Sequence, residues 1–388
     1  MAAPVQTELS EVDPTRRTTF RDDIITLVAG TWLVAGIFID GWAHNNLDNL
    51  ETFFTPWHAA LYSGFAACAC WIAFLTRRGH VPGRSWWDSV PIGYRPAAVG
   101  VLTFLGSGAA DLVWHSVFGI EQNIKALFSP SHLGLLMGAM LILSAPLVAA
   151  WRTRPTRSRP RDLAPAMASV TLTGALLAFI LQQYALFAGR DFVTIAAGRR
   201  VTQQVVDGQL TQVIVPAAGT NVVIQAGLAA FLIGTVTLFT PLLLLLRRWE
   251  LPAWTPLVVL VPQCVALQAL DAYRAPWLLL AGVLGALVVC GLFALVRATP
   301  GHGLRLRICC SAAPVLFFGI YLGTVAIHDG GLVWSPELWG GTLVWCGLLM
   351  LGLTTLMLVP PTPLEQTESD DAARHQPYEG SGPGASRG

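Results

Sequence analysis

Two stretches of the sequence contain the same three chemically active residues in the same order: an aspartate, a histidine one helical turn later and a second histidine further along. The six residues are Asp40, His44, His58, Asp111, His115 and His132. In a helix, an Asp-x3-His spacing places both side chains on one face. Imidazole and carboxylate together suit zinc, iron or copper better than calcium or magnesium, which prefer oxygen ligands. The pattern therefore predicts a transition-metal site.

The second histidine of each stretch lies in a longer repeated segment. An ungapped alignment of His58 with His132 pairs Asn49 with Asn123, Phe54 with Phe128, Thr55 with Ser129, Pro56 with Pro130 and Gly64 with Gly138. A hydroxyl residue followed by proline is typical of a helix start, with the hydroxyl as N-cap and proline in the first turn. Each second histidine should then lie in the first turn of a helix. We therefore expect an internal repeat of one helical hairpin.

Ionisable groups of this kind are costly in an apolar segment. Near the centre of a bilayer each costs about 2.5–3.5 kcal/mol on insertion scales, and less towards the interface, so they should face the bundle interior together. Two metal arrangements fit: one histidine-rich centre oriented by the aspartates, or two adjacent three-ligand centres with open positions. A proton or ion relay, a hydrogen-bonded network with a structural role only, and a b-type haem held by two histidines are the other interpretations.

A weaker form of the pattern recurs later in the chain, where two further helices should end in acids. His328 is an additional candidate metal ligand in this region. Asp271, Asp329 and Glu337 are candidate catalytic acids or bases, because a hydrolytic reaction needs such a group beside the metal. Arg274 is most simply interpreted as the salt-bridge partner of Asp271.

The composition indicates that these residues belong to a chain that lies mostly within a lipid bilayer. Hydrophobic residues make up 54% of the 388 and charged residues only 12%, and the mean hydropathy is +0.57. Apolar runs of about 20 residues recur, the length that crosses a bilayer as a helix. The expected spans are 22–44, 55–77, 95–118, 130–151, 163–188, 221–246, 254–272, 276–297, 308–328 and 336–359. The predicted fold class is an all-α polytopic membrane helix bundle of about ten transmembrane helices arranged as repeated hairpins.

Arginine distribution predicts the orientation, because short loops rich in Lys and Arg stay in the cytoplasm. Alternate loops carry most of the arginines, among them Arg77, Arg78, Arg152, Arg154 and Arg248. Both termini would then be cytoplasmic. The Asp/His sets would lie on the extracytoplasmic side of the plasma membrane of a bacterium.

Three segments outside the spans have their own character. Residues 1–20 and 361–388 are polar and should be disordered, flanking a bundle over residues 21–360. The extracytoplasmic loop 189–220 has β-branched runs interrupted by an Asp-Gly pair at 207–208. This composition predicts a small β-hairpin or lid.

The element Asp40-x3-His44-x13-His58 resembles the Asp-x3-His...His metal motif in the C subunit of the copper membrane monooxygenases, the particulate methane and ammonia monooxygenase family. The resemblance implies that these three residues are copper ligands and that the later Asp/His set is a second copy. It covers only residues 40–58 and their repeat, and the spacing and the duplication differ from the family. An enzyme of this kind would use a redox partner or other membrane subunits.

Three functions fit these expectations. The favoured one is a membrane-embedded metal-dependent enzyme that oxidises a lipophilic small molecule at a copper site, with iron or zinc as alternative metals. The others are an ion or metal transporter with the Asp/His cluster as a relay, and a zinc-dependent lipid hydrolase. A transporter should also have ionisable groups at mid-membrane depth, whereas these crowd one side. The sequence shows no P-loop, Rossmann, GxSxG or HExxH motif and no basic patch that would indicate a nucleic-acid partner.

Overall fold

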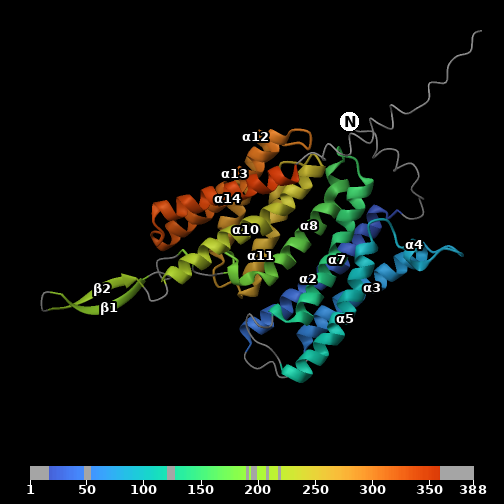
Figure 1. Ribbon diagram of the computed structural model, residues 1–388, viewed down its shortest axis with the longest axis horizontal. Coiled ribbons are helices and arrows are strands. Elements are labelled where there is room, and N and C mark those ends of the chain that lie inside the picture. Colours follow the sequence, from blue (N-terminus) through green and yellow to red (C-terminus); the bar gives the residue numbers. More distant parts are fainter. Residues whose placement is uncertain are drawn as a thin grey trace, which may run out of the picture.

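The computed structural model of the protein describes residues 17–47, 54–119, 127–188, 192–193, 199–206, 209–216 and 220–358. Within these ranges the chain is a helix bundle with one two-stranded sheet (Figure 1). Nine of the described helices are long and apolar enough to cross a membrane. They are α2 (Phe20–Asn46), α3 (Pro56–Arg78), α5 (Arg95–Phe118), α7 (Pro130–Thr153), α8 (Pro160–Ile180), α10 (Thr220–Arg248), α12 (Trp277–Val296), α13 (Gly303–Asp329) and α14 (Pro336–Met357). The predicted polytopic helix bundle is confirmed.

The remaining expected span, residues 254–272, is a helix that is shorter than a bilayer crossing. Helix α11 (Thr255–Leu270) has 16 residues, which is about 24 Å at 1.5 Å per residue, whereas the hydrocarbon core is about 30 Å thick. The helix ends where the backbone turns, with positive φ angles of 52° at Ala272 and 54° at Tyr273. Its buried face packs against α8, α12 and α2.

The fifth span ends earlier than the expected residues 163–188. Helix α8 stops at Ile180 and is followed by a short 3-10 helix, η2 (Gln182–Tyr184). Between them Leu181 leaves the helical region, with φ −98° and ψ 17°. The side chain of Gln182 is buried and accepts a hydrogen bond from Asn45 Nδ2 on α2 at 2.7 Å. The end of α8 thus coincides with a hydrogen bond to α2, and the hydropathy of the sequence does not predict that end.

Helices α3 and α7 begin as their N-cap patterns predict. The Thr55 hydroxyl accepts a hydrogen bond from the His58 N–H at 3.1 Å. The Ser129 hydroxyl accepts one from the His132 N–H at 3.4 Å. A proline follows each cap, where the missing N–H would have no partner within the helix. Both histidines therefore lie in the first turn of their helices, as expected.

Two helical hairpins carry the Asp/His sets: α2 packs along α3, and α5 packs along α7 (Figure 1). Glycines let the paired backbones approach closely. A Cβ added at Gly64 would lie 2.6 Å from the Leu33 Cα, and one at Gly138 would lie 2.7 Å from the Phe104 nitrogen. Gly64 and Gly138 are paired in the repeat alignment, so equivalent positions make the close contact in both hairpins. These contacts fix how closely the ends of the paired helices approach.

A β-hairpin precedes α10 and projects from the bundle, at the end opposite the short helix α4 (Trp86–Ser89) (Figure 1). Strand β1 (Arg199–Val206) pairs antiparallel with β2 (Gln209–Pro216). The hairpin expected within residues 189–220 is thus confirmed. Its turn, Asp207-Gly208, lies outside the described residues, as do residues 1–16 and 359–388, which include most of the segments predicted to be disordered.

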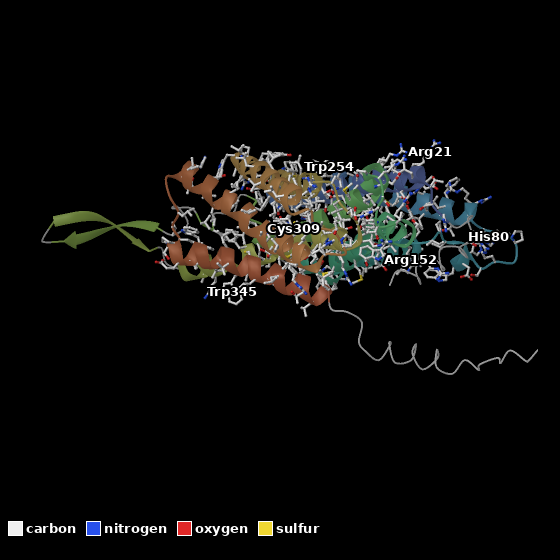
Figure 2. The ribbon with its side chains drawn as sticks, turned by 90° about the horizontal axis from the view of Figure 1, so that it is seen from above. Arg21, His80, Arg152, Trp254, Cys309 and Trp345 are labelled. Carbon is white, nitrogen blue, oxygen red and sulfur yellow. The ribbon has the colours of Figure 1, made fainter. Side chains whose placement is uncertain are left out.

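Many basic residues lie away from the β-hairpin, although its strand β1 begins with two arginines. Figure 2 shows Arg21, His80 and Arg152 in the half of the molecule opposite the β-hairpin. Arg78 ends α3, and Arg248 ends α10. With this arrangement the arginine rule places the Asp/His end outside and the arginine-rich end in the cytoplasm, and that orientation stays a prediction.

Replacing Gly138 with alanine should destabilise the α5–α7 hairpin, because the new Cβ would press on backbone rather than on a flexible side chain. We expect a loss of about 1–3 kcal/mol in the free energy of unfolding, measured as a lower unfolding temperature in detergent. Gly106→Ala in α5 is the matched control, since a Cβ there meets nothing within 4 Å. Equal unfolding temperatures for the two variants would contradict the close contact.

Candidate metal centre

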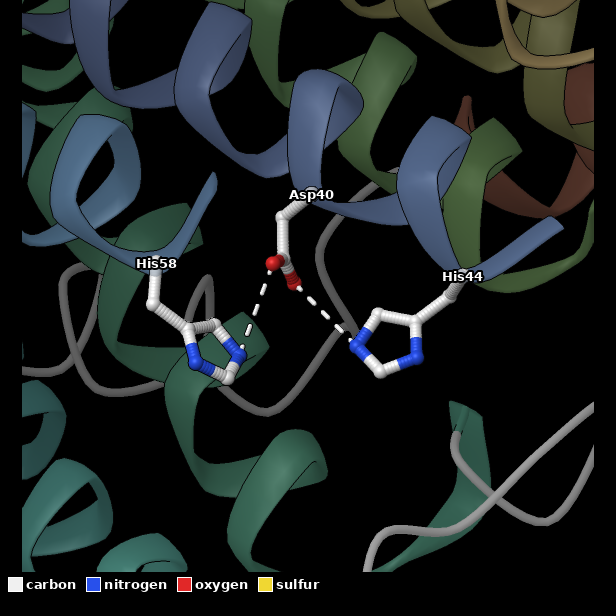
Figure 3. Close-up of side chains that lie close together, drawn as sticks. All are labelled: Asp40, His44 and His58. Atoms are coloured by element: carbon white, nitrogen blue, oxygen red, sulfur yellow. Dashed lines mark ion pairs between the residues drawn. The ribbon is translucent and has the colours of Figure 1, made fainter. Parts of the chain in front are cut away.

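The first Asp/His set joins the end of α2 to the start of α3 (Figure 3). Asp40 Oδ2 lies 3.8 Å from Nε2 of His44, one helical turn later. Asp40 Oδ1 lies 3.4 Å from Nε2 of His58. The carboxylate therefore lies between the two imidazoles, with one oxygen facing each ring (Figure 3). Helical spacing on α2 and the N-cap of α3 together bring the three side chains to one place.

The second set has a similar geometry at the end of α5 and the start of α7. Asp111 Oδ1 lies 3.5 Å from Nε2 of His115 and 3.4 Å from Nε2 of His132. Here one carboxylate oxygen faces both rings. In each set, one potential ligand atom per residue lies within 4.8 Å of the other two. The six side chains therefore converge as two groups of three, which we call the Asp40 group and the Asp111 group.

The distances in both groups suit the ligands of a shared ion. Metal bonds of about 2.0–2.2 Å to nitrogen and oxygen place two ligands of a tetrahedral ion roughly 3.3–3.6 Å apart. An N–H···O hydrogen bond usually spans about 2.7–3.2 Å. Three of the four separations between Nε2 and carboxylate oxygen are 3.4–3.5 Å, within this range, and the separation between Asp40 and His44 is slightly longer, at 3.8 Å. The residues present thus fit a zinc, copper or iron ion in each group, with positions left for further ligands.

Neighbouring polar atoms orient the histidines of the Asp111 group. His115 Nδ1 lies 3.2 Å from the carbonyl oxygen of Gly119, so an Nδ1–H donates there and leaves Nε2 as the ligand atom. His132 Nδ1 lies 2.6 Å from the Ser129 hydroxyl. Both contacts hold the orientation of the ring, and the Gly119 carbonyl, which can only accept, also fixes the tautomer of His115. Ser129 thus has two roles, as helix cap and as histidine partner.

The two groups differ in how enclosed they are. The Ser131 hydroxyl donates to Asp111 Oδ1 at 2.8 Å, and the side chains of Asp111 and His115 are only 1% and 3% exposed. The aligned position in the first copy is Trp57, which has no hydroxyl. The side chain of Asp40 is 13% exposed. The carboxylate of the Asp111 group is therefore the more enclosed, while His132, 20% exposed, is the accessible member of that group.

The groups lie side by side rather than at separate places in the bundle. The ring centroids of His44 and His58 are 6.2 Å apart, those of His58 and His115 are 6.5 Å apart, and those of His115 and His132 are 5.6 Å apart. The step between the groups is thus similar to the step within each group. Because each carboxylate lies next to its own pair of imidazoles, this geometry favours two adjacent three-ligand positions over one histidine-rich centre.

A cavity of about 80 Å³ adjoins both groups. Asp40 and His44 of the Asp40 group and His132 of the Asp111 group line it. Its remaining walls are mainly apolar and come from α2, α3, α5, α7 and α8. The amides of Asn45 and Gln182 complete the lining. The cavity therefore offers an apolar space in contact with potential metal ligands from both groups.

His328 belongs to neither group in the described part of the chain. Its Nδ1 lies 2.7 Å from Asp329 Oδ1, and its ring stacks on Trp277 with the centroids 4.0 Å apart. The side chain of His328 is half exposed. A metal-binding role for His328 and a catalytic role for Asp329 stay predictions, and this placement adds no support to either.

The other candidate acids also lie outside the two groups. Asp271, at the end of α11, forms an ion pair with Arg274 at 3.3 Å, the partner expected from the sequence. Glu337 is exposed in the first turn of α14. Neither lines the cavity beside the Asp/His groups. Their predicted role as acid or base beside a metal therefore gains nothing from the geometry.

Three residues of the site were not among the sequence candidates. Ser131 had a detectable signal, because it places a hydroxyl next to a repeated histidine where the first copy has Trp57. Gln182 is one of the polar residues in the last part of the fifth expected span, but its hydrogen bond with Asn45 joins positions 137 residues apart. No periodicity or motif predicts such a pair.

Replacing Ser131 with alanine should weaken metal binding, because Asp111 loses the hydroxyl that orients it. Removal of such a partner typically lowers metal affinity about 10–100-fold, which competition with a chromophoric chelator would measure. Ser116→Ala is the matched control, since among the described residues that exposed hydroxyl bonds only to the Leu112 carbonyl of its own helix. Unchanged affinity in the Ser131 variant would contradict the assignment.

No protein-family model, curated protein or solved structure matches the chain. The assignment of these residues therefore rests on their geometry. The resemblance to the copper membrane monooxygenases thus remains a local similarity of ligand spacing. What fold and site establish together is a membrane-helical protein with two adjacent Asp/His groups that could each hold a metal ion.

Proposed function

We propose that the protein is a membrane-embedded metal-dependent enzyme that oxidises a lipophilic small molecule, with the Asp40 and Asp111 groups each holding a transition-metal ion. The observation that carries the proposal is the cavity, which is lined by apolar side chains and by ligand atoms from both groups. An apolar pocket with a few convergent polar groups is the usual form of a small-molecule site. A site with a structural role only would need no such space.

The chain's own residues would bind and orient the substrate. Leu61, Phe104 and Phe179 line the cavity and would exclude water from its apolar part. Asp40 and His44 would hold one ion at the cavity wall, and Ser131 would keep Asp111 oriented towards the other. Copper or iron bound there supplies the redox chemistry for oxidation by oxygen. The electrons would come from a redox partner or another membrane subunit.

The alternatives have less support from the described residues. A zinc hydrolase needs an acid or base beside the metal, but Asp271 is paired with Arg274, and Glu337 is exposed. A transporter needs polar sites along its path, whereas both described groups lie at the same end of the paired helices. A cavity of about 80 Å³ has room for roughly five to eight water-sized groups, far fewer than the atoms of a porphyrin, which favours separate ions over a haem.

Elemental analysis of protein purified in mild detergent tests the metal assignment. We expect about two ions per chain, copper or iron rather than zinc, because each group offers three protein ligands. Replacing His44 or His115 with alanine should lower the content to about one ion, since each variant breaks one group.

His328→Ala is the control for these variants. It removes a histidine that follows the same helix-end pattern and belongs to neither group, so the metal content should be unchanged. Oxygen consumption with a lipophilic reductant then tests the activity. Zinc alone would support the hydrolase, and metal-free protein would overturn the proposal.

A further inference from the structure

The cavity has one feature that an apolar substrate would not require. Gln182 is 3% exposed and lines the cavity. Its Oε1 accepts the hydrogen bond from Asn45 Nδ2 at 2.7 Å, which fixes the orientation of the amide. The amide therefore has its two N–H donors still to place.

These donors face accessible space. The described polar atoms that are fully enclosed without a partner do not include Gln182 Nε2. The hydrogen bond from Asn45 is the one that the structure records for this side chain within the described residues. The cavity is the space that Gln182 lines. Gln182 Nε2 is thus not fully enclosed, and the side chain that carries it lines the same chamber as the metal-type ligands.

From this arrangement we propose that the cavity takes a small uncharged amphiphile, with an apolar body and one acceptor oxygen that Gln182 recognises. The proposal rests on the proposed function in treating this ligand as the substrate. A carbonyl, ether or hydroxyl oxygen supplies the acceptor. A ligand without one leaves a buried donor unpaired, which disfavours it.

The walls and the volume limit the ligand further. In the proposed function Asp40, His44 and His132 are taken by the ions, so the lining left to the ligand is apolar apart from the amides of Asn45 and Gln182. A charged group would lose its hydration there without a paired side chain. A water-sized group needs about 10–15 Å³ of such space. A cavity of about 80 Å³ therefore holds roughly five to eight non-hydrogen atoms. The ligand class is thus small, uncharged and singly polar.

Diethyl ether and n-pentane form a matched pair of probes, because they have the same shape and differ by one acceptor oxygen. The full chain, with nitrogen-labelled glutamine, is titrated with each probe as purified and again after chelation. The amide resonance of Gln182 is the one missing from the spectrum of Gln182→Met. Ether should shift this resonance saturably and bind roughly fivefold more tightly than pentane, after correction for partition into detergent.

Two variants separate recognition from nonspecific binding. Gln182→Met keeps the size of the side chain and should abolish the preference for ether. Gln183→Met is the matched control, because Gln183 is the next residue along the chain and does not line the cavity. This variant should keep the preference. Equal binding of ether and pentane to the wild-type chain would overturn the proposal, even where Gln182→Met fails to fold. A preference for ether that survives in Gln182→Met would overturn it as well.

The titration after chelation distinguishes a failure of this inference from a failure of the proposed function. An ether preference in a chain that binds no metal would uphold the recognition by Gln182 and overturn the metalloenzyme. Metal binding without an ether preference would uphold the two metal positions and overturn the acceptor class.

Discussion

The structure depends on one requirement: ionisable groups at the ends of apolar helices must lie in contact with one another, because each would be costly to bury alone. Asp40 and Asp111 each face two imidazoles, so neither of these carboxylates is buried alone. This contact is only possible if the helices of each hairpin approach closely, which Gly64 and Gly138 allow. Helix caps, close backbone packing and the pairing of charged groups therefore all favour the same positions for the Asp/His side chains. Such agreement between local and tertiary interactions is typical of a sequence that specifies one structure.

Much of this arrangement can be predicted from the sequence, because it depends on local patterns. The apolar runs predict the helices, and Thr55 and Ser129 predict where two of them begin. The Asp-x3-His spacing then predicts that one helix face carries both side chains. Convergence of the two sets follows from the burial cost of each, without any knowledge of how the hairpins pack.

The parts that sequence analysis does not reach depend on contacts between distant segments. The early end of α8 accompanies the bond between Gln182 and Asn45, which hydropathy does not register. His328 follows the same helix-end pattern as the ligands, yet it stacks on Trp277 in the other half of the bundle. The cavity arises from side chains of five helices, so no single segment of the sequence contains its shape.

The cavity shared by the two groups has a kinetic consequence. Asp111 and His115 are almost fully buried, whereas His132 is 20% exposed and lines the same chamber as Asp40 and His44. An ion at either group would therefore exchange with the surroundings through that chamber. A molecule that fills the chamber would slow the loss of both ions at once, so that occupancy of the cavity and retention of the metal would be linked.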